Sequence, residues 1–196
     1  ISGRDTSNTL IVETGGFRGV FDNGYRNLIN YTGIDRFIIY GMDDSAHSDS
    51  YITGNNGTEE VYLGAGDDIV NLNSGDDIAG GGAGIDGIWV NLAASTSAIV
   101  WDLAANFYHG PFGDFQNFEY FQTVTTGLGS DQIVTTAFSR NEIINLGAGD
   151  DIATVVAGAD VVNGGAGLDT LVINWSGSTG NMMSNPIAPG GTGGMD

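Results

Sequence analysis

The chain has 196 residues, with 33 Gly, 3 Pro and no Cys, which excludes a disulfide framework and a thiolate metal site. Its 24 acidic residues outnumber 5 basic ones, and the formal charge of −19 disfavours binding to nucleic acid or to an anionic membrane surface and favours binding to cations. No apolar run reaches the roughly 18 residues that a membrane span needs, while a hydrophobic share of 41% is enough for a folded core.

Residues 1–33 are predicted to be the trailing part of a preceding repeat unit, because residues 9–12 resemble residues 170–173. The start of the chain lacks the basic segment and apolar segment of a secretory signal peptide. We therefore interpret the chain as a segment of a larger protein. Helical periodicity is almost absent, and short β-branched runs favour strands, so the sequence predicts a nearly all-β fold.

Three nonapeptides follow one another without a gap over residues 63–89. Gly permits positive φ and close approach of the backbone, so a turn of this kind can direct main-chain carbonyl oxygens toward an ion. An Asp adds a charged oxygen, and oxygen-rich sites suit Ca²⁺ better than transition metals. The fourth residues are Gly66, Gly75 and Gly84, and the sixth residues are Asp68, Asp77 and Asp86.

The eighth residue of each nonapeptide is predicted to turn inward and to pack the short strand that follows the turn. These residues are Val70, Ile88, Ile144, Val162 and Leu171. The Asp residues at the fifth position, Asp67, Asp76 and Asp150, are predicted to point to solvent.

An aromatic-rich stretch follows the first three nonapeptides. We interpret it as core, or as a cover over an irregular coil, in preference to a sugar-binding platform. Its members are Phe107, Tyr108, Phe112, Phe115, Phe118, Tyr120 and Phe121. The two histidines, His47 and His109, are predicted to be solvated or hydrogen-bonded turn residues. No nucleophile elbow or HExxH motif is present, and we predict no catalytic site.

The glycine- and aspartate-rich block recurs at a constant offset, since residues 64–69 match residues 147–152 and residues 81–86 match residues 164–169. This duplication predicts one unit over residues 34–116, with a calcium block at 54–89, and a second over residues 117–180, with a calcium block at 126–172. A flexible Gly-rich tail is predicted over residues 181–196.

Two nonapeptides make one full coil, so turns that lie two nonapeptides apart should stack on the same edge and share an ion. Four pairs satisfy this spacing: Glu59 with Asp77, Asp68 with Asp86, Glu142 with Asp160, and Asp151 with Asp169. Two further pairs, Asp49 with Asp68 and Asp131 with Asp151, have a slightly longer spacing and would add two weaker sites. The predicted ligand set is Glu59, Gly64, Gly66, Asp68, Gly75, Asp77, Gly82, Gly84, Asp86, Asp131, Glu142, Gly147, Gly149, Asp151, Gly158, Asp160, Gly165, Gly167 and Asp169.

Three other interpretations of the Gly-Asp turns are weaker. Isolated Asx-turns without metal would not recur in register. A phosphate-binding loop would need a Walker pattern, and the chain has no Lys. An EF-hand needs helices around its loop and a different spacing of acidic residues.

The nonapeptides resemble the RTX, or hemolysin-type, calcium-binding repeats. The resemblance implies a parallel β-roll, or β-solenoid, that binds Ca²⁺ and belongs to an extracellular protein, commonly exported by type I secretion from Gram-negative bacteria. This sequence departs from the pattern at Leu63, Leu72 and Leu146, which replace the first Gly, at Glu59 and Glu142, which replace Asp, and at Arg140, which replaces Gly. Residues 98–119 resemble the spacers between calcium blocks in this family.

The sequence therefore predicts a non-enzymatic calcium-binding segment that folds after secretion and stabilises a larger extracellular protein. Calcium ions, and neighbouring repeats of the same protein, are its predicted partners. The alternative is an adhesin module that binds a glycan or another surface through the aromatic spacer.

Overall fold

The computed structural model describes residues 8–13, 16–20, 26–30, 36–41, 48–53, 58–72 and 75–176, and side chains within residues 38–41, 48–51, 58–72 and 75–176. His47 and the predicted tail, residues 181–196, lie outside these residues. The described part consists of strands and one short 3-10 helix, η1 (Leu103–Ala105). None of its helices is long and apolar enough to cross a membrane.

Short strands make up much of the described sequence. They are β1 (Asn8–Glu13), β2 (Gly16–Val20), β3 (Arg26–Asn30), β4 (Arg36–Tyr40), β5 (Asp49–Thr53), β6 (Thr58–Tyr62), β7 (Ile69–Leu72), β8 (Asp77–Gly80), β9 (Gly87–Asn91), β10 (Val100–Asp102), β11 (Phe107–Gly110), β12 (Gly113–Gln116), β13 (Tyr120–Thr125), β14 (Gln132–Val134), β15 (Ile143–Asn145), β16 (Ile152–Val155), β17 (Val161–Asn163) and β18 (Thr170–Ile173).

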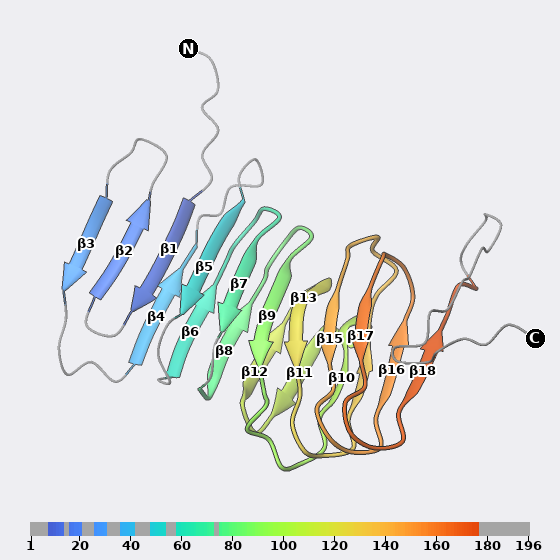
Figure 1. The fold of residues 1–196 in the computed structure, drawn as a ribbon. Coiled ribbons are helices and arrows are strands. Elements are labelled where there is room, and N and C mark those ends of the chain that lie inside the picture. The colour runs from blue at the N-terminus through green and yellow to red at the C-terminus, as the bar shows by residue number, and fades with distance from the viewer. Residues whose placement is uncertain are drawn as a thin grey trace, which may run out of the picture.

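From β4 onward the chain winds as a parallel β-roll whose strands alternate between two faces (Figure 1). One face is a nine-stranded sheet in the order β17-β15-β13-β9-β7-β5-β1-β2-β3. The other face consists of a five-stranded sheet, β11-β12-β8-β6-β4, and a four-stranded sheet, β10-β14-β16-β18. The predicted all-β, parallel roll is confirmed. Antiparallel pairing is found between β1, β2 and β3 and between β11 and β12.

The strand registers show that two nonapeptides complete one coil. Val70 of β7 lies opposite Ile88 of β9, and Ala153 of β16 lies opposite Leu171 of β18, so each residue pairs with the one two nonapeptides further along the chain. Tyr51 lies opposite Val70 at a slightly longer spacing. The extra residues that the sequence shows in some coils are therefore accommodated in the turns, and the strands stay in register.

Alternate strand residues fill the space between the two faces. Val61, Val70, Ala79 and Ile88 are each fully buried, as expected for residues that point inward from successive strands. Leu63, Leu72 and Leu146, which occupy the first position of their nonapeptides, are also buried. These departures from the Gly pattern therefore extend the apolar core into the turns.

The eighth-position residues face inward as predicted, including Leu171, which lies opposite the fully buried Ala153, but one of them is not covered. Val70, Ile88 and Ile144 are fully buried and Val162 packs against the core, whereas Leu171 is 50% exposed. Leu171 lies in β18, the outermost strand of its sheet, where no further described strand covers it.

The spacer between the repeat blocks widens one face of the roll. Strands β9 and β13 pair directly on the nine-stranded face, so the coil continues there across the spacer. On the other face, β12 pairs with β8, β11 folds back antiparallel on β12, and β10 starts the four-stranded sheet beside β14. The spacer therefore places β10, β11 and β12 where an ordinary coil has one strand.

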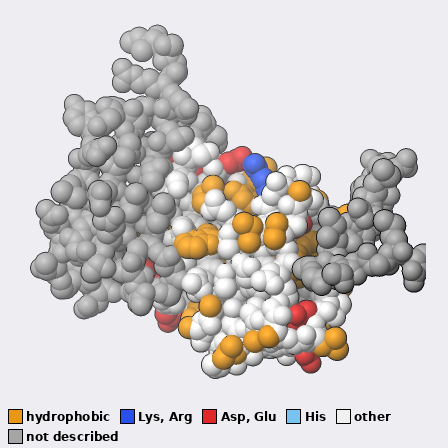
Figure 2. All heavy atoms as spheres, in the orientation of Figure 1, with side chains coloured by type: hydrophobic (Ala, Val, Ile, Leu, Met, Phe, Trp, Pro, Cys, Tyr) orange, Lys and Arg blue, Asp and Glu red, His pale blue; other side chains and the backbone are white. Residues whose placement is uncertain are grey.

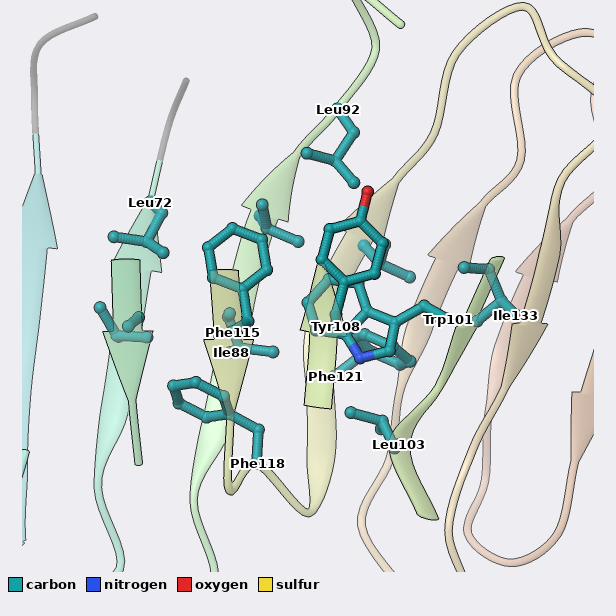
Figure 3. Close-up of a cluster of buried hydrophobic side chains, with 14 of the residues drawn as sticks. Leu72, Ile88, Leu92, Trp101, Leu103, Tyr108, Phe115, Phe118, Phe121 and Ile133 are labelled. Carbon is teal, nitrogen blue, oxygen red and sulfur yellow. The ribbon is translucent and has the colours of Figure 1, made fainter. Parts of the chain in front are cut away.

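Aromatic side chains fill this wider coil (Figure 3). Trp101 stacks on Tyr108 at 4.5 Å and on Phe115 at 5.2 Å between ring centroids, and Phe121 meets it edge-on at 4.9 Å. Tyr108, Phe115, Phe118 and Phe121 are buried, while Phe107 is 54% exposed. The core interpretation of the aromatic stretch is therefore confirmed for most of its members.

Equivalent strands of the two duplicated blocks lie on opposite faces of the roll. By the offset that takes Gly64 to Gly147, strands β7, β8 and β9 correspond to β16, β17 and β18. Strands β7 and β9 belong to the nine-stranded sheet, whereas β16 and β18 belong to the four-stranded sheet. The exchange arises because β10, β11 and β12 together occupy one face and an odd number of half-coils therefore separates β7 from β16.

Replacement of Phe121 by Ala should strongly destabilise the roll, because it removes a fully buried ring that packs against Trp101. We expect the free energy of unfolding to fall by about 3–5 kcal/mol. The matched control is Phe107→Ala, at a largely exposed ring of the same spacer, which should change it by less than about 1 kcal/mol. Urea denaturation in one calcium-containing buffer measures both, and equal losses would contradict the core assignment.

Candidate metal centre

The turns of the roll lie along two edges. The turns that lead into the nine-stranded face form what we call the first edge. Its described members include residues 63–68, 81–86, 117–119, 135–142 and 156–160. The second edge is formed by the turns that leave that face, including residues 92–99, 126–131, 146–151 and 164–169. Acidic side chains lie at the margins of the face seen in Figure 2 and not across its middle. The roll therefore concentrates negative charge in its turns.

Each predicted pair of acidic residues is stacked, and the two members are joined by a hydrogen bond from main chain to side chain. The amide of Asp68 donates to Oδ1 of Asp86 at 2.8 Å, and the amide of Asp151 donates to Oδ1 of Asp169 at 3.2 Å. Four further bonds of the same kind run from Glu59 to Asp77 (3.0 Å), Glu142 to Asp160 (3.0 Å), Asp49 to Asp68 (2.6 Å) and Asp131 to Asp151 (2.6 Å).

In five of the ten paired acidic residues, one carboxylate oxygen is buried without a hydrogen-bond partner among the described residues. A buried carboxylate oxygen that no donor reaches is costly unless a cation neutralises it. Among the described residues, the oxygens in this state are Oδ2 of Asp68, Asp86, Asp131 and Asp151, and Oε2 of Glu142. This set of orphaned oxygens fits a cation and does not fit an anion such as phosphate.

The glycines of the predicted ligand set are required by backbone conformation and by the contact between coils. All of them have positive φ: Gly64, Gly66, Gly75, Gly82, Gly84, Gly147, Gly149, Gly158, Gly165 and Gly167. A Cβ on Gly84 would lie 1.7 Å from the carbonyl oxygen of Gly66, and one on Gly167 would lie 1.7 Å from that of Gly149. Main chain therefore stacks directly on main chain, with carbonyl oxygens in the contact.

Short hydrogen-bonded bridges hold these glycine turns together. The amide of Ala83 donates to the oxygen of Gly64, and the amide of Gly66 donates to the oxygen of Ala83, both at 2.9 Å. Ala166 makes the same two bonds with Gly147 and Gly149, also at 2.9 Å. Equivalent turns of the two blocks thus have the same structure although they lie on opposite edges.

Burial disfavours the charged form of the stacked carboxylates. It raises the pKa of Asp68 to about 6, of Asp86 to about 7 and of Glu142 to about 8, although main-chain hydrogen bonds oppose the shift. Burial also raises the pKa of Asp77, Asp151 and Asp160. A bound cation would favour the ionised form of the same groups.

The donor set favours a hard cation. No three His, Cys, Asp or Glu side chains converge as a metal cluster in the described part of the chain. Each stacked pair instead offers two carboxylates beside main-chain carbonyl oxygens. Ca²⁺ accepts about six to eight oxygen ligands in flexible geometry, whereas Zn²⁺ prefers tetrahedral nitrogen and sulfur ligands.

A family comparison agrees with this chemistry. Four copies of the RTX calcium-binding nonapeptide repeat match the chain, over residues 53–88 and 136–171. Both blocks are RTX calcium-binding repeats. No curated protein and no solved structure matches the chain significantly. The RTX repeats contain all but one of the predicted ligands, the exception being Asp131, and they identify calcium as the ion that such turns bind.

Sequence reasoning missed the contacts that cross the spacer. The amide of Asp86 donates to Oε2 of Glu119 at 2.7 Å, and the amide of Ile99 donates to Oδ1 of Asp131 at 2.7 Å. Glu142 likewise accepts the amide of Phe121 at 2.9 Å. Glu119 lies outside any nonapeptide, and its distance of 33 residues from Asp86 is not a multiple of nine.

The fifth-position acids are exposed, as predicted, and two of them also bond to the next coil. Asp67 accepts the amide of Ile85 at 3.0 Å, and Asp150 accepts that of Leu168 at 2.9 Å. Arg140 pairs with Asp67 at 3.4 Å. His109, predicted in a turn, instead lies in β11, where it is exposed and pairs with Asp114.

Replacement of Gly84 by Ala should weaken both folding and calcium binding, because the new Cβ would overlap the carbonyl oxygen of Gly66. We expect the calcium midpoint of folding to rise at least about tenfold, which corresponds to about 1.4 kcal/mol. The control is Gly80→Ala, since a Cβ there meets its nearest neighbours at an ordinary 3.6 Å. Circular dichroism during calcium titration measures both midpoints, and equal shifts would contradict the proposed stacking requirement.

The metal-free chain should become less stable as the pH rises from about 4 to about 8. In the folded state the pKa values of Asp68, Asp86 and Glu142 lie above their ordinary values. Their contribution to folding stability is therefore present below about pH 4 and is lost as the pH passes through about 6, 7 and 8. Circular dichroism in chelator across this range tests the trend, because the folded fraction of the metal-free chain should fall as the pH rises. Calcium affinity should rise with pH, because protons compete for the same oxygens. A metal-free stability that increases with pH would contradict the assignment.

Proposed function

We propose that this chain is a calcium-binding β-roll segment that folds when it binds Ca²⁺ outside the cell. In this role it acts as a structural and stabilising region of a larger extracellular protein, and its stacked coils contact neighbouring repeats. The observation that carries the proposal is the row of buried carboxylate oxygens without partners in the RTX turns. We propose no enzymatic activity for it.

Electrostatic repulsion between the acidic side chains makes folding depend on calcium. Asp86 is fully buried, and the neighbouring charges of Asp68, Glu119 and Asp67 are all negative. Without a cation, folding brings such charges together in a medium that screens them poorly. Four Ca²⁺ ions, one at each regularly spaced pair, would neutralise eight of the 19 net negative charges. Repulsion therefore opposes folding until the ions bind.

Mass action then couples folding to location. A site that exists only in the folded chain stabilises it by about 2.7 kcal/mol when free calcium is a hundredfold above Kd. Extracellular calcium modules have Kd values of about 10⁻⁴–10⁻³ M. The chain would therefore remain unfolded at low cytosolic calcium, in a form suited to export, and fold outside the cell.

The aromatic spacer does not favour the alternative of a glycan-binding adhesin. A sugar platform needs exposed rings, whereas Tyr108, Phe115, Phe118 and Phe121 are in the core. Phe107 is exposed, but it lies beside His109 and not in a row of exposed rings.

Calcium titration of the metal-free chain should produce a cooperative rise in the β-sheet circular dichroism signal, and chelator should reverse it. Mg²⁺ should be much less effective, because it dehydrates reluctantly and demands octahedral geometry. A β-sheet spectrum that is unchanged after chelation would contradict folding on calcium binding.

Asp86→Asn should raise the calcium midpoint of folding about tenfold or more, whereas Asp76→Asn, at an exposed fifth-position residue, should change this midpoint less than about twofold.

A further inference from the structure

The stack of carboxylates on the first edge continues beyond the first RTX block. The family match ends at residue 88 and begins again at residue 136. Between them, Oε2 of Glu119 accepts the amide of Asp86 at 2.7 Å, and the amide of Glu119 donates to the oxygen of Asp86 at 2.9 Å. The carboxylate of Glu119 therefore accepts the amide of Asp86 as the carboxylate of Asp86 accepts the amide of Asp68, although Glu119 belongs to the spacer.

The free oxygen of Asp86 lies near Gly81, where the turn that contains Asn117 and Glu119 also comes close. Asp86 is fully buried and its Oδ2 atom has no hydrogen-bond partner among the described residues. A Cβ on Gly81 would lie 2.8 Å from this oxygen and 2.1 Å from the carbonyl oxygen of Asn117. The two oxygens therefore border the same confined space beside Gly81, which is too tight for any side chain.

Asn117 adopts the conformation that brings its carbonyl to this space. Its φ of 56° is in the left-handed region, which few residues other than Gly occupy and which Asn tolerates. The turn from β12 to β13 thus supplies a main-chain oxygen from Asn117 and a carboxylate from Glu119. Both lie against the turn that holds Asp86.

Within the described part of the chain, the charges near Asp86 are not balanced by a basic side chain. The acidic neighbours that act on it are Asp68, Glu119 and Asp67. Arg140, whose side chain lies near this edge, pairs with Asp67 and lies over the ring of Tyr120, 5.6 Å from its centroid. Among the described residues, this guanidinium therefore donates no hydrogen bond to the carboxylate of Asp86 or of Glu119.

We propose that Asp86, Glu119 and the carbonyl oxygen of Asn117 form a further calcium site, which joins the first RTX block to the spacer. The site rests on the proposed calcium-binding function of the roll, and it adds a ligand that lies outside the repeats. An ion there connects coils that are 33 residues apart in sequence. It continues the line of cations on the first edge past the point where the nonapeptides stop.

The competing explanation is that Glu119 only accepts a hydrogen bond. Glu119→Gln separates the two roles, because the amide oxygen still accepts the Asp86 amide while the charge is lost. The matched control is Asp114→Asn, which removes one carboxylate from β12 of the same spacer, where Asp114 pairs with the exposed His109. Calcium-45 equilibrium dialysis of the full chain at saturating calcium counts the bound ions, and circular dichroism reports the fold.

The proposal expects Glu119→Gln to bind one Ca²⁺ fewer than wild type, with an unchanged β-sheet spectrum at saturating calcium. Asp114→Asn should bind the wild-type number. An unchanged number and affinity in Glu119→Gln would overturn the site while leaving calcium binding by the RTX turns intact. Loss of all ions together with the β-sheet spectrum would also overturn it, because Glu119 would then support the whole roll. A wild-type chain that binds no calcium would refute the proposed function itself.

Discussion

The direct stacking of one main-chain turn on another is the constraint on which the rest of the roll depends. A Cβ on Gly84 or Gly167 would overlap a carbonyl oxygen of the previous coil. Once side chains are excluded from this contact, the adjacent carboxylates are buried with it, and one oxygen of each accepts an amide from the coil before. In Asp68, Asp86, Asp131, Asp151 and Glu142 the other oxygen is buried without a donor among the described residues. The close contact between turns thus creates both the stable stack and its demand for cations.

The core and the edges of the roll therefore have opposite effects on the stability of the metal-free stack. Inward residues such as Val70, Ile88 and Phe121 are fully buried and favour the stack at any calcium concentration. The buried acids oppose it until their charge is neutralised. Because the coils are thin and each contacts its neighbours only, a change at one edge is transmitted along the stack through shared residues such as Asp68, which bonds to the coil on each side.

Local physics made much of this structure predictable from sequence. The glycine positions and the regularly spaced acidic pairs follow from the needs of a tight turn and a fixed coil length, and the structure brings all six predicted pairs together. The spacer was not predictable in the same way. In its hairpin Trp101 packs against rings from β11, β12 and β13, and Glu119 meets Asp86 because β13 pairs with β9 with Tyr120 opposite Gly87. The exposure of Leu171 likewise depends on its place in an outermost strand, which no local pattern records.

Equivalent strands of the two blocks lie on opposite faces, and this gives the duplication a different symmetry in space from the one it has in sequence. In sequence, the second block is a simple translation of the first along the chain, since residues 64–69 recur as residues 147–152. In space, an odd number of half-coils separates equivalent strands such as β7 and β16, so the copy is turned over and its equivalent glycine turns lie on the other edge. Two sequence units, and not one, would then make a full structural period. In an array built by further duplication, each turn of the unit would alternate between the two edges from copy to copy, so any difference in charge between the turns of one unit would average out along the axis.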